Sequence, residues 1–78
     1  MSEAFATGDE RLITVAIGTA AKARGMAAVA SDSGLSRENL YRALGEGGHP
    51  EFSTVMKVLN SLGVQLEVKP KIEEAEAA

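Results

Sequence analysis

The sequence predicts a small, mostly α-helical domain of four to five helices that ends in one short β-strand. Successive segments carry apolar residues at helical spacing and are closed by glycine. One segment near the C-terminus instead alternates apolar and polar residues with a period of two. The chain has 78 residues, 45% of them apolar and 24% charged, so it forms one domain and is too hydrophobic to be disordered throughout.

The first predicted helix begins at Asp9 and Glu10, whose charges suit the positive end of a helix dipole, and it ends at Gly25. Its apolar positions recur at helical spacing and comprise Leu12, Ile13, Ala16, Ile17, Ala20 and Ala21. Residues 1–8 have no such pattern and are predicted to be a flexible N-terminus, although residues 4–7 also suit a short strand.

Three further helices are predicted. The second covers residues 26–33, and the third begins at Ser36, a residue type that caps helices, and runs to Leu44. The fourth covers residues 52–62 and ends at Gly63. Its apolar stripe consists of Phe52, Val55, Met56, Leu59 and Leu62.

The predicted strand covers residues 64–69, where Val64, Leu66 and Val68 alternate with Gln65, Glu67 and Lys69. A lone strand leaves its backbone groups unpaired. Pairing with the same strand of a second subunit about a two-fold axis resolves this, so the sequence predicts a homodimer. Residues 71–78 are predicted to be an acidic tail.

Residues 26–45, MAAVASDSGLSRENLYRALG, match a helix-turn-helix unit, in which two short helices are joined by a tight turn containing glycine. Ala30 is small where the two helices approach each other, and Gly34 suits a left-handed turn position. Leu35 fills the space beneath the turn. The flanking helices cover the apolar side of the unit, which gives a predicted helix-turn-helix domain over residues 9–70.

The second helix of this unit presents a polar face that suits the major groove of DNA. We call this set the recognition face; it consists of Arg37, Glu38, Asn39, Tyr41 and Arg42. Arginine donates two hydrogen bonds to guanine, a carboxylate accepts from cytosine and asparagine pairs with adenine. Double-stranded operator DNA is therefore the predicted partner, and a dimer would contact two half-sites roughly 34–36 Å apart.

A second set of residues suits DNA phosphates. It consists of Lys22, Arg24, Ser36, Ser53 and Thr54. Each has a structural alternative, because the two cations complement the C-terminal end of their own helix and the three hydroxyls are helix-capping types.

The recognition face also has structural alternatives. Residues 37–42 are compatible with an ordinary solvated helix surface, and Glu38 is placed to pair with Arg42 four positions later. Tyr41 is compatible with partial packing that leaves its hydroxyl exposed.

The charge distribution argues against a protein that holds DNA by bulk positive charge. The net charge is −3. Residues 9–45 carry five basic and four acidic side chains, for a net charge of +1, whereas residues 46–78 carry three basic and six acidic side chains, for −3. Binding is therefore expected to depend on a few placed contacts.

Several function classes are excluded by composition. The chain has no cysteine and one histidine, His49, so we expect neither a metal site nor a cofactor. No base with an orienting carboxylate accompanies a serine, and no P-loop lysine follows the glycines, so an enzyme is not expected. The sequence shows no signal peptide and no membrane-spanning run, which predicts a cytoplasmic protein without membrane contact.

Residues 34–70, GLSRENLYRALGEGGHPEFSTVMKVLNSLGVQLEVKP, resemble the addiction module antidote proteins, also described as prophage-type DNA-binding regulators. The resemblance extends over residues 8–70. It implies a phage-repressor-like helical fold, DNA reading by Arg37, Glu38, Tyr41 and Arg42, and often autorepression of an operon that encodes a toxin.

The sequence thus predicts a transcriptional repressor, an antitoxin that acts on its own operon. The alternative is a protein-interaction module that neutralises a cognate toxin and uses the helix-turn-helix as a scaffold. The acidic C-terminal half favours this alternative.

Overall fold

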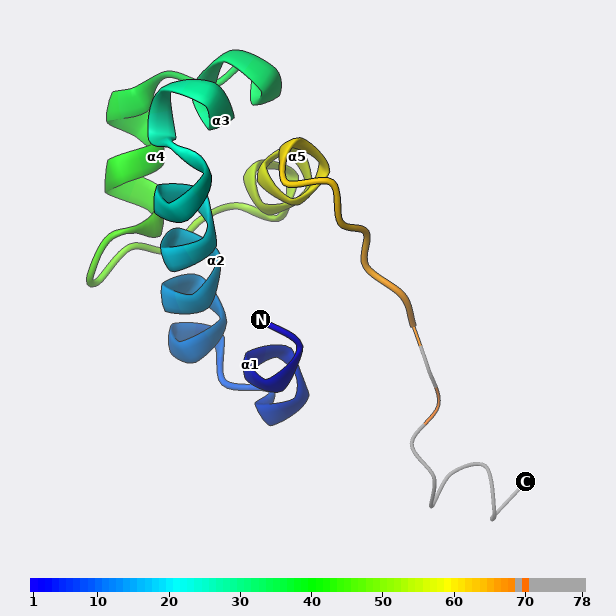
Figure 1. Cartoon of the computed structure of the whole chain (residues 1–78). Coiled ribbons are helices and arrows are strands. Elements are labelled where there is room, and N and C mark those ends of the chain that lie inside the picture. The colour runs from blue at the N-terminus through cyan, green and yellow to red at the C-terminus, as the bar shows by residue number, and fades with distance from the viewer. Residues whose placement is uncertain (69, 71–78) are drawn as a thin grey trace.

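The computed structural model describes residues 1–68 and Pro70, and its helices pack around one core (Figure 1). The elements are α1 (Ser2–Thr7), α2 (Glu10–Arg24), α3 (Met26–Ser33), α4 (Arg37–Leu44) and α5 (Phe52–Ser61). The mostly helical fold is confirmed. The four predicted helices are all present, with ends within about two residues of the prediction.

The N-terminus differs from the prediction, because residues 2–7 form α1 rather than a flexible segment or a strand. Gly8 ends this helix in the left-handed conformation, with φ of 72°, and its N–H donates to the carbonyl of Phe5. No residue of α1 is buried, but Phe5 packs against the core. Helix α1 contacts α2, but six residues are too few to leave a clear periodic pattern in the sequence.

Helix α2 begins at Asp9, whose carboxylate accepts hydrogen bonds from the backbone N–H groups of Arg11 and Leu12, at 2.9 and 3.3 Å. This is a side-chain N-cap. The helix ends at Gly25, where the chain turns by 102° into α3. No single helix among the described residues is long and apolar enough to cross a membrane, although α2 and α3 meet that test as a bent pair on length and composition alone.

The connection between α3 and α4 is tight. Gly34 is left-handed, with φ of 77°, and its N–H donates to the carbonyl of Ala30 at 3.0 Å. Ser36 then caps α4, because its Oγ accepts from the N–H of Asn39 at 3.0 Å. Leu35 and Ala30 both pack against the core. The predicted roles of Gly34 and Ser36 are confirmed.

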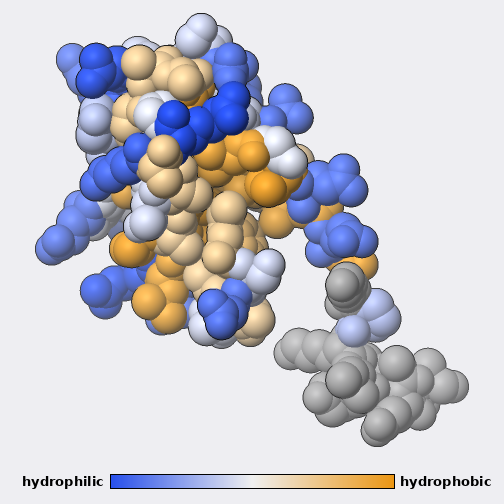
Figure 2. All heavy atoms as spheres, in the orientation of Figure 1, coloured by the Kyte–Doolittle hydropathy of each residue, from blue (hydrophilic) through white to orange (hydrophobic). Residues whose placement is uncertain are grey.

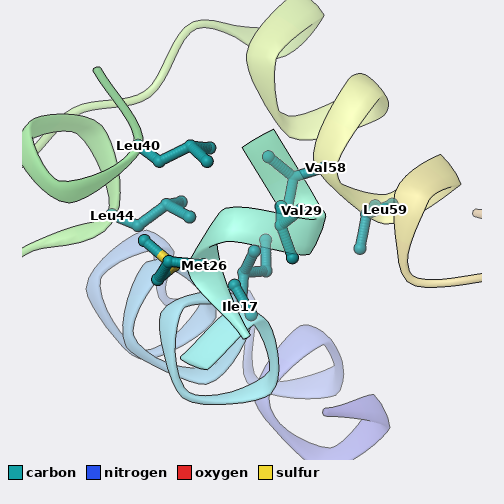
Figure 3. Packing of buried hydrophobic residues seen from close by; sticks show 8 residues of the cluster. Ile17, Met26, Val29, Leu40, Leu44, Val58 and Leu59 are labelled. Carbon is teal, nitrogen blue, oxygen red and sulfur yellow. The ribbon is translucent and has the colours of Figure 1, made fainter. Parts of the chain in front are cut away.

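The core lies where four helices meet (Figure 3). Its buried members are Ile17 and Ala21 of α2, Met26 and Val29 of α3, Leu40 and Leu44 of α4, and Val58 and Leu59 of α5. The predicted stripe of α5 is only partly correct, because Phe52 and Met56 are exposed. Met56 lies at the edge of the buried arc formed by Val58 and Leu59, whereas Phe52 is the first residue of α5, two turns before Leu59.

The predicted strand is not formed in the single chain. Residues 64–68 have no regular structure, and the trace leaves the helices at the end of α5 (Figure 1). A strand requires a neighbouring backbone, and α1 occupies the only other segment that suited one. Lys69 and the predicted acidic tail, residues 71–78, lie outside the described residues.

Candidate nucleic-acid interface

Helix α4 separates its apolar and polar residues onto opposite sides. Leu40 and Leu44, one turn apart, are 0% and 6% exposed and hold the helix against the core. All five residues of the recognition face are exposed: Arg37, Glu38, Asn39, Tyr41 and Arg42. Tyr41 is 47% exposed, so part of its ring packs as the alternative interpretation expects. The helix therefore offers a polar surface whose position is fixed by two buried leucines.

Three side chains of the recognition face contact one another. The guanidinium of Arg42 lies 3.8 Å from the Glu38 carboxylate, and it donates to Oδ1 of Asn39 at 3.3 Å. Both members of the ion pair are largely exposed, so the pair contributes only about 0.3–0.5 kcal/mol. The predicted pairing of residues 38 and 42 is thus present, and it is weak enough to be exchanged for a ligand.

A hollow of about 520 Å³ opens beside α4. Its polar lining comprises Asn39 and Arg42 of α4, Glu46 and His49 of the following loop, and Glu51 and Thr54 at the start of α5. The hollow brings Thr54, a predicted phosphate contact, next to two members of the recognition face. Ser53 is exposed on the same helical turn but does not line it.

The loop that forms one wall of this hollow is acidic, which the sequence motifs did not single out. Glu46 and Glu51 face the same space as Arg42, so the hollow does not collect anions by net charge. His49 Nδ1 lies 4.0 Å from a carboxylate oxygen of Glu10, a contact that becomes an ion pair when the imidazole is protonated. The glycine-rich composition was the only sequence signal for this loop.

The N-terminus of α5 is not capped by a side chain. Glu51 occupies the N-cap position, which places Ser53 and Thr54 inside the first turn. The alternative in which these hydroxyls cap the helix is therefore wrong. Ser36 does cap α4, and its hydroxyl proton stays available to donate.

The predicted cations of α2 lie apart from the hollow, which neither of them lines. Arg24 pairs with Asp32 of α3, with Nη2 and Oδ2 3.1 Å apart and both side chains half exposed. Lys22 is exposed two residues earlier on the same helix. The phosphate set therefore divides into a basic end of α2 and a hydroxyl-bearing region on α4 and α5.

Comparison with known proteins shows to which family the chain belongs. A family model described as probable addiction module antidote protein matches residues 1–70. The chain belongs to this family. An antidote protein implies a cognate toxin, so this antidote protein has its role in a toxin–antitoxin pair.

A relative of the antidote protein occurs in Haemophilus influenzae. It is described as an uncharacterized protein and is 44% identical over 69 residues, which cover 88% of this chain and 71% of the relative. No solved structure matches the chain.

Proposed function

We propose that this antidote protein is a sequence-specific DNA-binding regulator that represses the operon of its own toxin–antitoxin pair. The observation that carries the proposal is the division of α4, in which two buried leucines hold a helix whose other side exposes the whole recognition face. A helix that enters the major groove needs both properties, a fixed position and polar side chains that reach base edges.

In this proposal α3 and α4 form the helix-turn-helix unit, and the N-terminal turns of α4 enter the groove. Arg37 and Arg42 donate to guanine, and Glu38 accepts from cytosine when its weak pair with Arg42 opens. Asn39 already orients Arg42 through its side-chain oxygen, so it either positions that arginine or contacts adenine itself. Tyr41, which is 47% exposed, contributes its hydroxyl to the complex.

The proposed phosphate contacts are few. The first turn of α5 offers backbone N–H groups that no side chain caps, together with the hydroxyls of Ser53 and Thr54. Ser36 contributes from the start of α4. Lys22 and Arg24 add charge at the end of α2, provided that Arg24 exchanges its pair with Asp32 for a phosphate. A complex with so few cations on the phosphates depends on base contacts for its specificity, and its affinity varies little with salt.

The proposed regulator needs neither catalysis nor a cofactor, and we expect it in the cytoplasm, where operator DNA lies. It requires two copies, since a helix-turn-helix protein reads a palindrome with two recognition helices.

The experiment is a fluorescence anisotropy titration with two labelled duplexes. One comes from upstream of the protein's own gene, and the other is a scrambled duplex of equal length and composition. We expect the upstream duplex to bind at least about 10³-fold more tightly, the lower range of specificity for such proteins. Equal affinity for both duplexes would contradict the proposal.

Arg37→Ala tests the recognition face in the same titration. We expect a loss of about tenfold or more in affinity for the upstream duplex, because a bidentate contact to a base contributes about 1–3 kcal/mol. The matched control is Arg11→Ala, which removes an exposed arginine from α2. Unchanged far-UV circular dichroism in both variants would establish that the fold is retained.

The second candidate function is a toxin-neutralising module in which the helix-turn-helix is only a scaffold. The acidic wall of the hollow and the net charge of −3 favour it. It predicts that the upstream and scrambled duplexes bind equally weakly, so the same titration separates the two candidates.

A further inference from the structure

The structure leaves an apolar surface uncovered near its C-terminal end. Phe52 and Met56, one turn apart on α5, are 71% and 41% exposed. Residues 64–68 follow α5, and their three apolar side chains are exposed as well. Figure 2 shows hydrophobic atoms over α5 and the start of the segment that leaves it. Five of the nine large exposed apolar side chains of the described residues thus belong to α5 and the segment that follows it.

The same segment has backbone groups to pair. The N–H of Val64 donates to the carbonyl of Leu59 at 3.1 Å, and no further backbone–backbone hydrogen bond follows among the described residues. Apolar and polar residues alternate from Val64 to Val68, which puts all the apolar side chains on one face of an extended chain. A second extended chain is the partner that satisfies both the backbone and this face.

We propose that a second copy of this chain covers the surface. Residues 64–68 of the two copies pair as antiparallel strands about a two-fold axis, and Phe52 and Met56 of each copy pack beside the strand pair. Any two copies supply identical segments in opposite directions, so the contact is self-complementary. The proposed repressor function requires such a dimer, so the inference rests on that function. The dimer itself is tested on the protein without DNA.

The apolar pattern selects one register for the strand pair. When Leu66 lies opposite Leu66 of the partner subunit, Val64 lies opposite Val68 of the partner subunit. Opposite residues of an antiparallel pair point to the same face, so six apolar side chains gather on one side.

Charge and local structure exclude the neighbouring registers. Centring the pair on Glu67 would place two carboxylates opposite each other, which is destabilising. Centring it on Gln65 would place Val68 opposite Leu62 of the partner subunit, and Leu62 is the helical cap residue of α5. In the register centred on Leu66, Glu67 instead faces an uncharged glutamine.

Single cysteines test this register, because the chain has no cysteine of its own. Leu66→Cys places two thiols opposite each other with Cα atoms about 4.5–5.5 Å apart, within the range that a disulfide spans. Val64→Cys offsets the two thiols by four residues, about 13 Å along the strands, which no disulfide spans. Under mild oxidation we expect covalent dimer from Leu66→Cys and almost none from Val64→Cys.

A mixture of Val64→Cys and Val68→Cys chains brings the two thiols together again, so covalent heterodimer is expected from it. Equal cross-linking of Val64→Cys and Leu66→Cys alone would overturn the register and the inference with it.

Sedimentation velocity at tens of micromolar tests the wider interface. We expect wild type at twice the monomer mass. Phe52→Ser is expected to raise the dimer Kd about tenfold or more, since it removes a buried aromatic contact. The matched control is Leu12→Ser, which alters a 50% exposed residue of α2 and leaves the Kd unchanged. Monomeric wild type would overturn the inference, and if that monomer still bound the upstream duplex the proposed function would stand without it.

Discussion

Gly18 of α2 lies so close to Leu44 of α4 that a Cβ atom built on the glycine would come within 2.9 Å of the leucine carbonyl oxygen. The obstacle is backbone, which cannot swing aside as a side chain does. This contact therefore sets how closely the helix that carries the recognition face approaches α2.

Gly18→Ala is expected to destabilise the domain by about 1–3 kcal/mol, because overpacking outweighs the better helix propensity of alanine. Urea unfolding measures the change. Thr19→Ala, at the exposed neighbouring position, should stay within about 0.5 kcal/mol of wild type. A stability gain for Gly18→Ala would show that α2 and α4 do not approach this closely.

The turn between the helices gives a second prediction. Gly34 has φ of 77° and open space around its missing Cβ, so the cost of a side chain is conformational and not steric. Gly34→Ala should lower the free energy of unfolding by about 1–2 kcal/mol. Gly34→Asn should cost less, since asparagine tolerates the left-handed region. Equal losses for both substitutions would indicate a steric cause instead.

The two sides of α4 should respond differently to truncation. Leu40 is fully buried, and Leu40→Ala is expected to cost about 2–5 kcal/mol, a large part of the stability of a domain this small. Arg37→Ala should change stability by less than about 0.5 kcal/mol while weakening DNA binding. Thermal melts of both variants beside their anisotropy titrations make the comparison. A large stability loss for Arg37→Ala would show that this arginine is structural.

Salt dependence tests the claim that few cations contact phosphates. With Lys22 and Arg24 from each of two copies, the slope of log affinity against log salt is expected to be about −4 or shallower. Titrations of the upstream duplex over a range of potassium chloride concentrations measure it. A slope near −8, roughly twice that value, would mean that bulk charge holds the DNA.

The parts of the fold that local signals specify were predictable from the sequence. Gly34 and Ser36 mark the turn and the start of α4, and the structure uses both in those roles. The spacing of Leu40 and Leu44 predicts which side of α4 is buried. It therefore also predicts that the recognition face, on the other side, is exposed.

The remaining features depend on contacts between distant residues. Helix α1 packs on α2 and places Phe5 against the core, but its six residues leave no clear periodic signal. The hollow forms only when α4, its following loop and α5 meet, so Glu46 and Glu51 carried no sequence signal for it. Phe52 looks like a core residue by spacing and is exposed, because it is the first residue of α5 and periodicity does not show where along a helix the packing begins. The predicted strand is not formed by residues 64–68 of the single chain, because alternation alone does not supply a neighbouring backbone.

The most direct test of the central claim is base preference. Selection of bound duplexes from a randomised pool should give one defined palindromic motif for the wild-type chain. For Arg42→Ala, we expect the preference to relax at one base pair in each half-site, where guanine is no longer favoured, while the other positions keep theirs. A motif that Arg42→Ala and Arg37→Ala both leave unchanged would contradict the assignment of α4 as the helix that reads DNA.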